Sequence, residues 1–262
     1  MVIYLIYFLI VIAATTVGAI TGMGGGIIIK PILDVMKGYD VATIGILSSI
    51  SVFAMAIVSV LKQIQQKVKI NYNIAIPLAL GSVAGGIIGQ KMLSAVITWL
   101  NANNKVTIVQ NIMLAILIIS VYFYMLNKSK IPTLGITNIF LVVIAGLFLG
   151  IISSFLGIGG GPINIALLIF VFSFDIKTAT LCSIITILFA QTSKLLSVVL
   201  NAGFASYDLS MLPPMLIGAV SGGFIGSWLN KKLTEKTIEI CFNGVQGFVF
   251  IICIFNIIVN FV

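Results

Sequence analysis

Apolar stretches separated by short polar turns run along the whole chain. An apolar stretch of 18 or more residues can span the roughly 30 Å hydrocarbon core of a membrane as an α-helix. Six stretches have about the length of one spanning helix, whereas the first and the fifth are too long for one span and marginal for two. The stretches cover residues 3–36, 41–61, 74–90, 106–126, 136–174, 178–200, 209–229 and 240–261. The pattern therefore predicts an all-α polytopic membrane protein.

Glycine runs interrupt the two overlong stretches. The first contains Gly-Met-Gly-Gly-Gly at 22–26, and the fifth contains Gly-Ile-Gly-Gly-Gly at 157–161. Each run is followed by a short apolar piece, 27–36 in the first case and 162–174 in the second. Non-helical backbone at membrane depth is tolerated only where protein buries it or water reaches it. We expect each overlong stretch to form a long helix, a glycine break and a short helix.

The two breaks belong to an internal duplication with a separation of 135 residues. In that register, Ser48 matches Ser183, and the flanking sequence matches too. A slip of two residues then aligns two stripes of glycines spaced four apart, which let helix backbones approach closely in lipid. The stripes are Gly81, Gly85 and Gly89 in the first copy and Gly218, Gly222 and Gly226 in the second. The sequence predicts two homologous halves, residues 1–130 and 131–262.

Loop lysines bear on whether the interrupted segments cross the membrane or double back. If both crossed, the loop lysines would divide about evenly between the two sides. If both double back, one side carries nine lysines and the other three, which is the stronger positive-inside pattern. The nine are Lys62, Lys67, Lys69, Lys128, Lys130, Lys177, Lys231, Lys232 and Lys236, and the three are Lys37, Lys91 and Lys105. The count favours re-entrant hairpins, three full spans in each half, and halves inverted relative to each other.

Composition and charge exclude several classes of protein. Of the 262 residues, 60% are hydrophobic and 8% are charged, against about 25% charged residues in soluble domains. The formal charge of +8 comes from lysines spread through the loops, so we expect no nucleic-acid partner. The chain has no histidine, and we expect Asp40 and Asp175 to be helix N-caps and no acidic side chain to lie in the core of a span. An enzyme, a metal site, a cofactor and a clear proton relay are therefore not expected.

The glycine breaks are the first candidates for a binding site. Glycine lets backbone N–H groups meet a ligand, and the short helix after each break presents the positive end of its dipole, which suits an anion. The candidates are Gly24, Gly25 and Gly26 in the first break and Gly159, Gly160 and Gly161 in the second. The alternative is that the runs are packing kinks. If the breaks bind an anion, alanine at Gly25 and Gly160 is expected to abolish that binding. If the protein is a pure scaffold, with a structural role only, the same substitutions are expected to leave its assembly largely intact.

A polar stripe follows each break. On a helix, the polar positions of the second copy share one face and could line a pathway, or could hydrogen-bond between helices. They are Ser183, Thr186 and Lys194, with Ser48, Ser51 and Ser59 as counterparts in the first copy.

Two lysines lie inside apolar sequence. An ionisable residue within a membrane is costly and indicates a functional site, unless its long stem reaches the membrane surface. Lys30 follows the first break, and Lys194 ends the stripe of the second copy. Asn164, in the second short apolar piece, and Gln191, beside the stripe, are further polar candidates.

The chain resembles the TauE/SafE sulfite exporter family. The resemblance is carried by TGMGGGIIIKP at 21–31 and LGIGGGPINIALL at 156–168, within eight apolar segments, and it extends over essentially the whole chain. It implies a multi-pass permease of the prokaryotic inner membrane for sulfur oxyanions or small organosulfonates, with the two glycine breaks in its site. It implies nothing specific for Lys30 or Lys194, which are nominated on physical grounds.

We therefore predict a transporter that binds a small anion between the two breaks near the membrane midplane. Lys30 and Lys194 would supply positive charge, and the polar stripes would supply neutral donors. One bundle would move against the other to alternate access. An anion channel and a non-transporting membrane assembly subunit are the alternatives. The identity of the anion, the direction of transport, the coupling and the formation of homo-oligomers stay open.

Overall fold

The computed structural model describes residues 2–66, 71–201 and 203–261, and within these residues it consists of helices and loops. Eight helices in this part of the chain are long and apolar enough to cross a membrane, and two more are short. The long ones are α1 (Val2–Thr21), α3 (Val41–Gln65), α4 (Tyr72–Leu100), α5 (Asn103–Asn127), α6 (Ile139–Leu156), α8 (Ile176–Asn201), α9 (Leu212–Lys232) and α10 (Glu235–Phe261); the short ones are α2 (Gly26–Met36) and α7 (Gly161–Phe172), and a 3-10 turn covers Phe204–Ser206. The predicted all-α polytopic architecture is confirmed.

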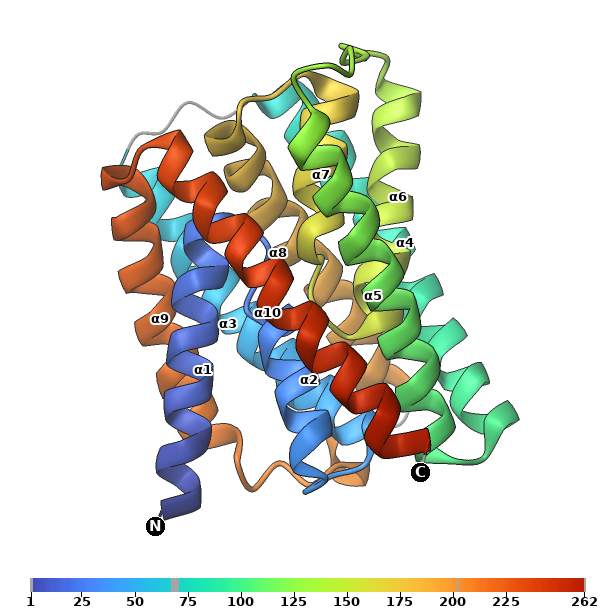
Figure 1. The fold of residues 1–262 in the computed structure, drawn as a ribbon. Helices are drawn as coiled ribbons and strands as arrows, with labels where there is room; N and C mark the ends of the chain where they lie inside the picture. Colours follow the sequence, from blue (N-terminus) through green and yellow to red (C-terminus); the bar gives the residue numbers. More distant parts are fainter. Residues whose placement is uncertain (1, 67–70, 202, 262) are drawn as a thin grey trace.

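Each short helix ends at the same end of the bundle at which the preceding long helix begins (Figure 1). Near the first pair, the ring of Tyr7 in α1 lies edge-on to that of Tyr39, just beyond α2, at 6.4 Å between centroids. Near the second pair, Ser173 Oγ donates to Thr133 Oγ1 at 2.7 Å, and the N–H of Leu134 donates to the carbonyl of Phe170 at 2.9 Å. The residues at the end of each short helix therefore contact residues at or just before the start of the preceding long helix.

Both helix breaks lie where the glycine runs predicted them. The loop after α1 contains Gly22 and Gly24, with φ angles of 76° and 74°, and the loop after α6 contains Gly157 and Gly159, with φ angles of 67° and 74°. Side chains disfavour this left-handed region, so glycine allows the turns at both sites. Pro162 lies in the first turn of α7, where its missing N–H costs no helical hydrogen bond.

The long helices exchange partners between the two predicted halves. α1 packs against α9, and α6 packs against α4. A methyl group at Gly85 would collide with the carbonyl oxygen of Leu147 in α6, and one at Gly222 would lie 2.7 Å from the carbonyl oxygen of Ile12 in α1. Gly81, Gly89, Gly218 and Gly226 pack in the same way on these two helices. Close backbone packing by both glycine stripes is confirmed, because only glycine leaves room for the neighbouring backbone.

Lysines gather on one end of the helix bundle. This lysine-rich face holds the ends of α3, α5, α7 and α9, at the top of Figure 1, and the opposite face holds both ends of the described chain. The lysine-rich face carries Lys62, Lys128, Lys130, Lys177, Lys231, Lys232 and Lys236, whereas the opposite face carries Lys37, Lys91 and Lys105. Lys67 and Lys69 of the predicted nine lie outside the described residues.

The two acids at matched helix starts are N-caps, as predicted. Asp40 accepts a hydrogen bond from the N–H of Thr43 at 3.2 Å. Asp175 accepts from the N–H of Thr178 at 2.9 Å and from its hydroxyl at 2.6 Å. Partial burial alone would raise the pKa of Asp175, but the hydrogen bonds from Thr178 and neighbouring backbone favour the carboxylate and hold that pKa below its ordinary value.

Candidate functional site

The two glycine breaks pack against each other in the centre of the molecule. The N–H of Gly161 donates to the carbonyl of Met23 at 3.0 Å. A methyl group at Gly24 would lie 3.0 Å from the carbonyl oxygen of Gly159, and one at Gly26 would collide with the carbonyl of Ile158. All five residues of each run are buried. We call this contact between residues 22–26 and 157–161 the crossing.

Polar side chains of α8 hold the crossing in place. Ser183 Oγ donates to the carbonyl of Gly22 at 2.6 Å, and Thr180 Oγ1 lies 3.3 Å from the carbonyl of Thr21. Thr186 instead donates to the carbonyl of Cys182 within its own helix, at 2.8 Å. The stripe of α8 is thus divided: Ser183 fixes the first break, whereas the Thr186 hydroxyl serves its own helix.

The matching stripe of α3 contains one unpartnered hydroxyl. Ser51 Oγ donates to the carbonyl of Leu47 at 2.9 Å, and Ser59 Oγ contacts the sulfur of Met55 at 3.4 Å. Ser48 is fully buried, and its Oγ has no hydrogen-bond partner among the described residues. A buried hydroxyl of this kind needs water or a ligand to satisfy it.

The glycines themselves are required by packing. A methyl group at Gly25 would lie 2.7 Å from Thr15 Cγ2, and one at Gly160 would lie 2.6 Å from Asn164 Nδ2 and 2.8 Å from Ile187 Cγ1. Gly160 also has a φ of 112°, which strains any other residue. The expectation that a pure scaffold would tolerate alanine at Gly25 and Gly160 is therefore wrong, because both substitutions disturb the fold itself.

Both short helices begin at the crossing without a side-chain cap. The N-cap residues are Gly25 for α2 and Gly160 for α7, and neither makes a side-chain cap hydrogen bond. The first N–H groups of a helix lack intrahelical partners and carry the positive end of its dipole. The crossing therefore brings two helix N-termini together, one from each half of the chain.

Lys30 lies in a buried ion pair that was not predicted from the sequence. Its Nζ lies 2.9 Å from Asp34 Oδ2, one turn further along α2, and both side chains are almost fully buried. Asn111 Nδ2 of α5 lies 3.4 Å from the same carboxylate oxygen, and Asn256 of α10 contacts Asn111 and the carbonyl of Pro31. Asp34 lies in the short helix α2, outside the eight candidate spans, so the expectation of no acidic side chain in the core of a span does not cover this buried acid. The i, i+4 spacing of Lys30 and Asp34 was the available signal.

Lys194 is also fully buried, but it has no counter-charge. Its Nζ lies 3.4 Å from the carbonyl of Gly45 in α3. Among the described residues, no carboxylate oxygen lies within 4.0 Å of this ammonium group. The Lys194 side chain is therefore enclosed by protein and is not paired with a carboxylate among the described residues.

The two buried lysines converge beside the second break. A methyl group at Gly157 would lie 3.3 Å from Lys30 Cδ and 3.6 Å from the Cα of Gly45, the residue that Lys194 contacts. The fold thus brings together one lysine from each predicted half.

Further polar atoms near the second break lack partners. Asn164 Oδ1, Gln191 Oε1 and Ser154 Oγ are buried and have no hydrogen-bond partner among the described residues. Gln191 Nε2 lies 3.4 Å from Ser153 Oγ and 3.4 Å from the position of a methyl group at Gly159. Asn164 and Gln191 were predicted from the sequence as polar candidates, whereas Ser154 was not. No three His, Cys, Asp or Glu side chains in the described part of the chain are grouped to hold a metal ion.

The sequence matches the family described as Sulfite exporter TauE/SafE over residues 7–252, which is nearly the whole chain and includes both glycine breaks. Neither a search of curated proteins nor a search of solved structures returned a match. With its apolar helices and its two central breaks, this multi-pass membrane protein belongs to the TauE/SafE sulfite exporter family.

Proposed function

We propose that the protein is a permease for a small anion, a sulfur oxyanion or an organosulfonate, bound at the crossing with Lys194 as its main positive charge. The observation that carries the proposal is the fully buried Lys194 ammonium without a counter-charge. An isolated buried charge is among the costliest features of a protein interior, and a bound anion offsets that cost.

Neutral donors complete the proposed site. Ser48 offers a free hydroxyl, and Asn164 and Gln191 offer amides whose oxygen atoms have no partner among the described residues. The N-termini of α2 and α7 add two positive dipole ends. Lys30 contributes to the potential but is largely neutralised by Asp34. Gly24–Gly26 and Gly159–Gly161 bring these elements together, and Ser51, Ser183 and Thr186 support the backbone around them.

We further infer that α1–α2 and α6–α7 are re-entrant hairpins in inverted halves, with the lysine-rich face towards the cytoplasm of a prokaryotic cell. Support comes from the exchange of helix partners between the halves and from the return of each short helix to the side of the preceding helix start. The positive-inside rule supplies the orientation. Movement of one bundle against the other then exposes the crossing to each side in turn.

Uptake of radiolabelled sulfite, sulfate and sulfoacetate into proteoliposomes tests the proposal. Wild-type protein is expected to give saturable uptake of at least one of these anions, and Lys194→Met to abolish it. Lys105→Met, at an exposed lysine of the opposite face, is the matched control and is expected to transport normally. Flux that never saturates would favour an anion channel. Equal activity of Lys194→Met and wild type would contradict the proposed site, and absence of all anion flux would contradict the proposed function.

A further inference from the structure

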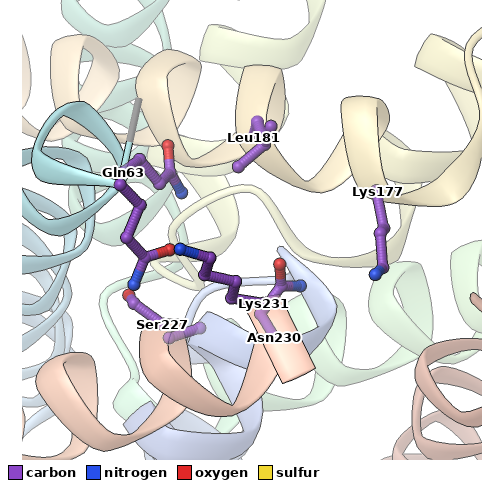
Figure 2. A pocket seen from close by; sticks show the side chains of 8 residues that line it. Gln63, Lys177, Leu181, Ser227, Asn230 and Lys231 are labelled. Carbon is purple, nitrogen blue, oxygen red and sulfur yellow. The ribbon is translucent and has the colours of Figure 1, made fainter. Parts of the chain in front are cut away.

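We propose that a pocket on the lysine-rich face is a second anion site, which loads the crossing from that side; this inference rests on the proposed function. The pocket lies between the C-terminal ends of α1, α3 and α9 and the first turns of α8 (Figure 2). Its volume is about 150 Å³. That is enough for a small oxyanion or a few water molecules.

The lining of this pocket is basic and rich in hydrogen-bonding groups. Lys177 and Lys231 line it together with Gln63, Ser227 and Asn230. No aspartate or glutamate lines it, and neither lysine has a carboxylate oxygen within 4.0 Å among the described residues. Other lysines of the same face are engaged elsewhere: Lys62 lies over the ring of Phe224, Lys232 lies over that of Trp228, and Lys128 pairs with Glu239. The two pocket lysines thus provide charge that protein carboxylates leave unpaired.

Two buried side chains of the pocket lack partners. Gln63 and Ser227 are each only 4% exposed, and Gln63 Oε1 and Ser227 Oγ have no hydrogen-bond partner among the described residues. The hydroxyl of Ser227 can donate to an anion oxygen, and rotation of the Gln63 amide presents its N–H₂ group instead of its oxygen. Buried polar atoms in native structures are nearly always satisfied by protein, water or ligand, so these two indicate an occupant.

The inner wall of the pocket is connected to the first glycine break. Asn230 Nδ2 donates to the carbonyl of Ile20 at 2.6 Å, two residues before Gly22. Leu181, which also lines the pocket, lies one residue from Thr180 and two from Ser183, whose side chains contact the carbonyls before and within that break. An anion in the pocket therefore sits next to the backbone that leads into the crossing.

A counterpart pocket lies on the opposite face, and it differs from the pocket of the lysine-rich face in the number of lysines that line it. It is lined by Gln90, Lys91, Ser94, Val198 and Asn201, with a volume of about 280 Å³. At the offsets of the internal repeat, Gln90 and Ser94 match Ser227 and Lys231, and Val198 and Asn201 match Gln63 and Gln66. Lys177 corresponds to Ala42. The duplication thus places one pocket on each face, and the lysine-rich one has two lysines where its counterpart has one.

Protection of an introduced cysteine from chemical modification tests this site directly. The reporter is Ser227→Cys in a chain whose three native cysteines, Cys182, Cys241 and Cys253, are replaced by alanine. Sulfate or ethanesulfonate is expected to slow its reaction with a small neutral methanethiosulfonate. Lys177→Gln/Lys231→Gln should raise the half-protecting concentration about tenfold, because charge-assisted contacts are lost. If the reporter variant does not fold, Gln66→Cys replaces it, since Gln66 also lines the pocket and is partly exposed.

Two controls distinguish anion binding in this pocket from the general electrostatic attraction of the lysine-rich face and from anion binding at the crossing. Lys130→Gln/Lys236→Gln removes the same charge from exposed positions on the same face and should change the half-protecting concentration by less than about twofold. Protection should persist in Lys194→Met. Absence of protection, equal weakening by the control pair, or loss of protection in Lys194→Met would each overturn the second site. Protection without any flux in proteoliposomes would instead overturn the proposed function.

Discussion

The two breaks differ in how they handle charge, although their backbones are related by the repeat. The first break is followed by Lys30, which has its own counter-ion, Asp34, within the same short helix. In the second short helix the corresponding positions are Ile165 and Ile169, so α7 carries no charge. The second half instead contributes Lys194 from α8, at the position of Ser59 in α3.

This difference assigns different roles to the two lysines. Lys30 is compensated by protein whether or not a ligand is present, and its network with Asn111 and Asn256 fastens α2 to α5 and α10. In the proposed function, Lys194 gains a counter-charge only when an anion binds. In the proposed site, the unpaired lysine rather than the paired one is therefore the main partner of the anion.

Removal of the counter-ion of Lys30 is the largest stability change that we expect. Asp34→Asn leaves Lys30 buried and unpaired, and breaking a buried pair in this way costs about 3–5 kcal/mol. The midpoint of thermal unfolding in detergent should fall markedly. The double variant Lys30→Met/Asp34→Asn removes both charges and should recover most of the loss. If Asp34→Asn unfolded at the wild-type temperature, the pairing of Lys30 with Asp34 would not be the stabilising contact described here.

Alanine substitutions in the two breaks should lower the stability of the fold by different amounts. Gly160→Ala forces a side chain into a left-handed φ, at about 1–3 kcal/mol, in addition to its contacts with Asn164 and Ile187. Gly25 has a helical φ of −67°, so Gly25→Ala carries only overpacking against Thr15, also about 1–3 kcal/mol. The midpoint of thermal unfolding should be lower for Gly160→Ala than for Gly25→Ala. Both midpoints should be lower than that of Gly244→Ala, whose added methyl group meets open space. The reverse ranking would contradict the backbone geometry at Gly160.

Removal of the N-cap residue Asp175 should cause the smallest loss of stability among these substitutions. Asp175→Ala loses two hydrogen bonds to Thr178, and removal of an N-cap typically costs about 1 kcal/mol. Because the pKa of Asp175 is lowered in the folded protein, its contribution is present above the ordinary value of 3.8 and is lost as the pH falls through the lowered pKa. The stability difference between Asp175→Ala and wild type should therefore vanish in strong acid. A difference that grew with acidity would contradict the cap.

The sequence predicted the elements that depend on local pattern. Apolar length predicted the spans, glycine runs predicted the two breaks, and the matched aspartates predicted the N-caps, because each of these follows from a few neighbouring residues. The glycine stripes also predicted close packing, but they did not identify α6 and α1 as the helices against which they pack. Choice of partner depends on how whole helices meet.

The sequence was less informative about the site, because its parts come from distant segments. Asp34 was missed since it lies near the end of a short apolar piece and reads as a boundary residue until α5 and α10 bury it. Gln63, Ser227 and Asn230 lie on two long helices and look like interface residues until the fold closes a pocket around them. Lys30 and Lys194 were both selected for their apolar surroundings, and only the structure distinguished the paired lysine from the unpaired one.

Anion-dependent thermal stability of the purified protein tests the central role of Lys194 most directly. Sulfite, sulfate, thiosulfate, sulfoacetate, taurine, acetate and phosphate would be compared for wild type, Lys194→Met and the control Lys105→Met. A ligand that binds only the folded state stabilises it by about 2.7 kcal/mol at a hundredfold excess over its dissociation constant. We predict a selective rise with a sulfur oxyanion or sulfonate in wild type and Lys105→Met, and none in Lys194→Met. An equal rise in Lys194→Met would contradict the assignment of the buried, unpaired lysine as the anion's partner.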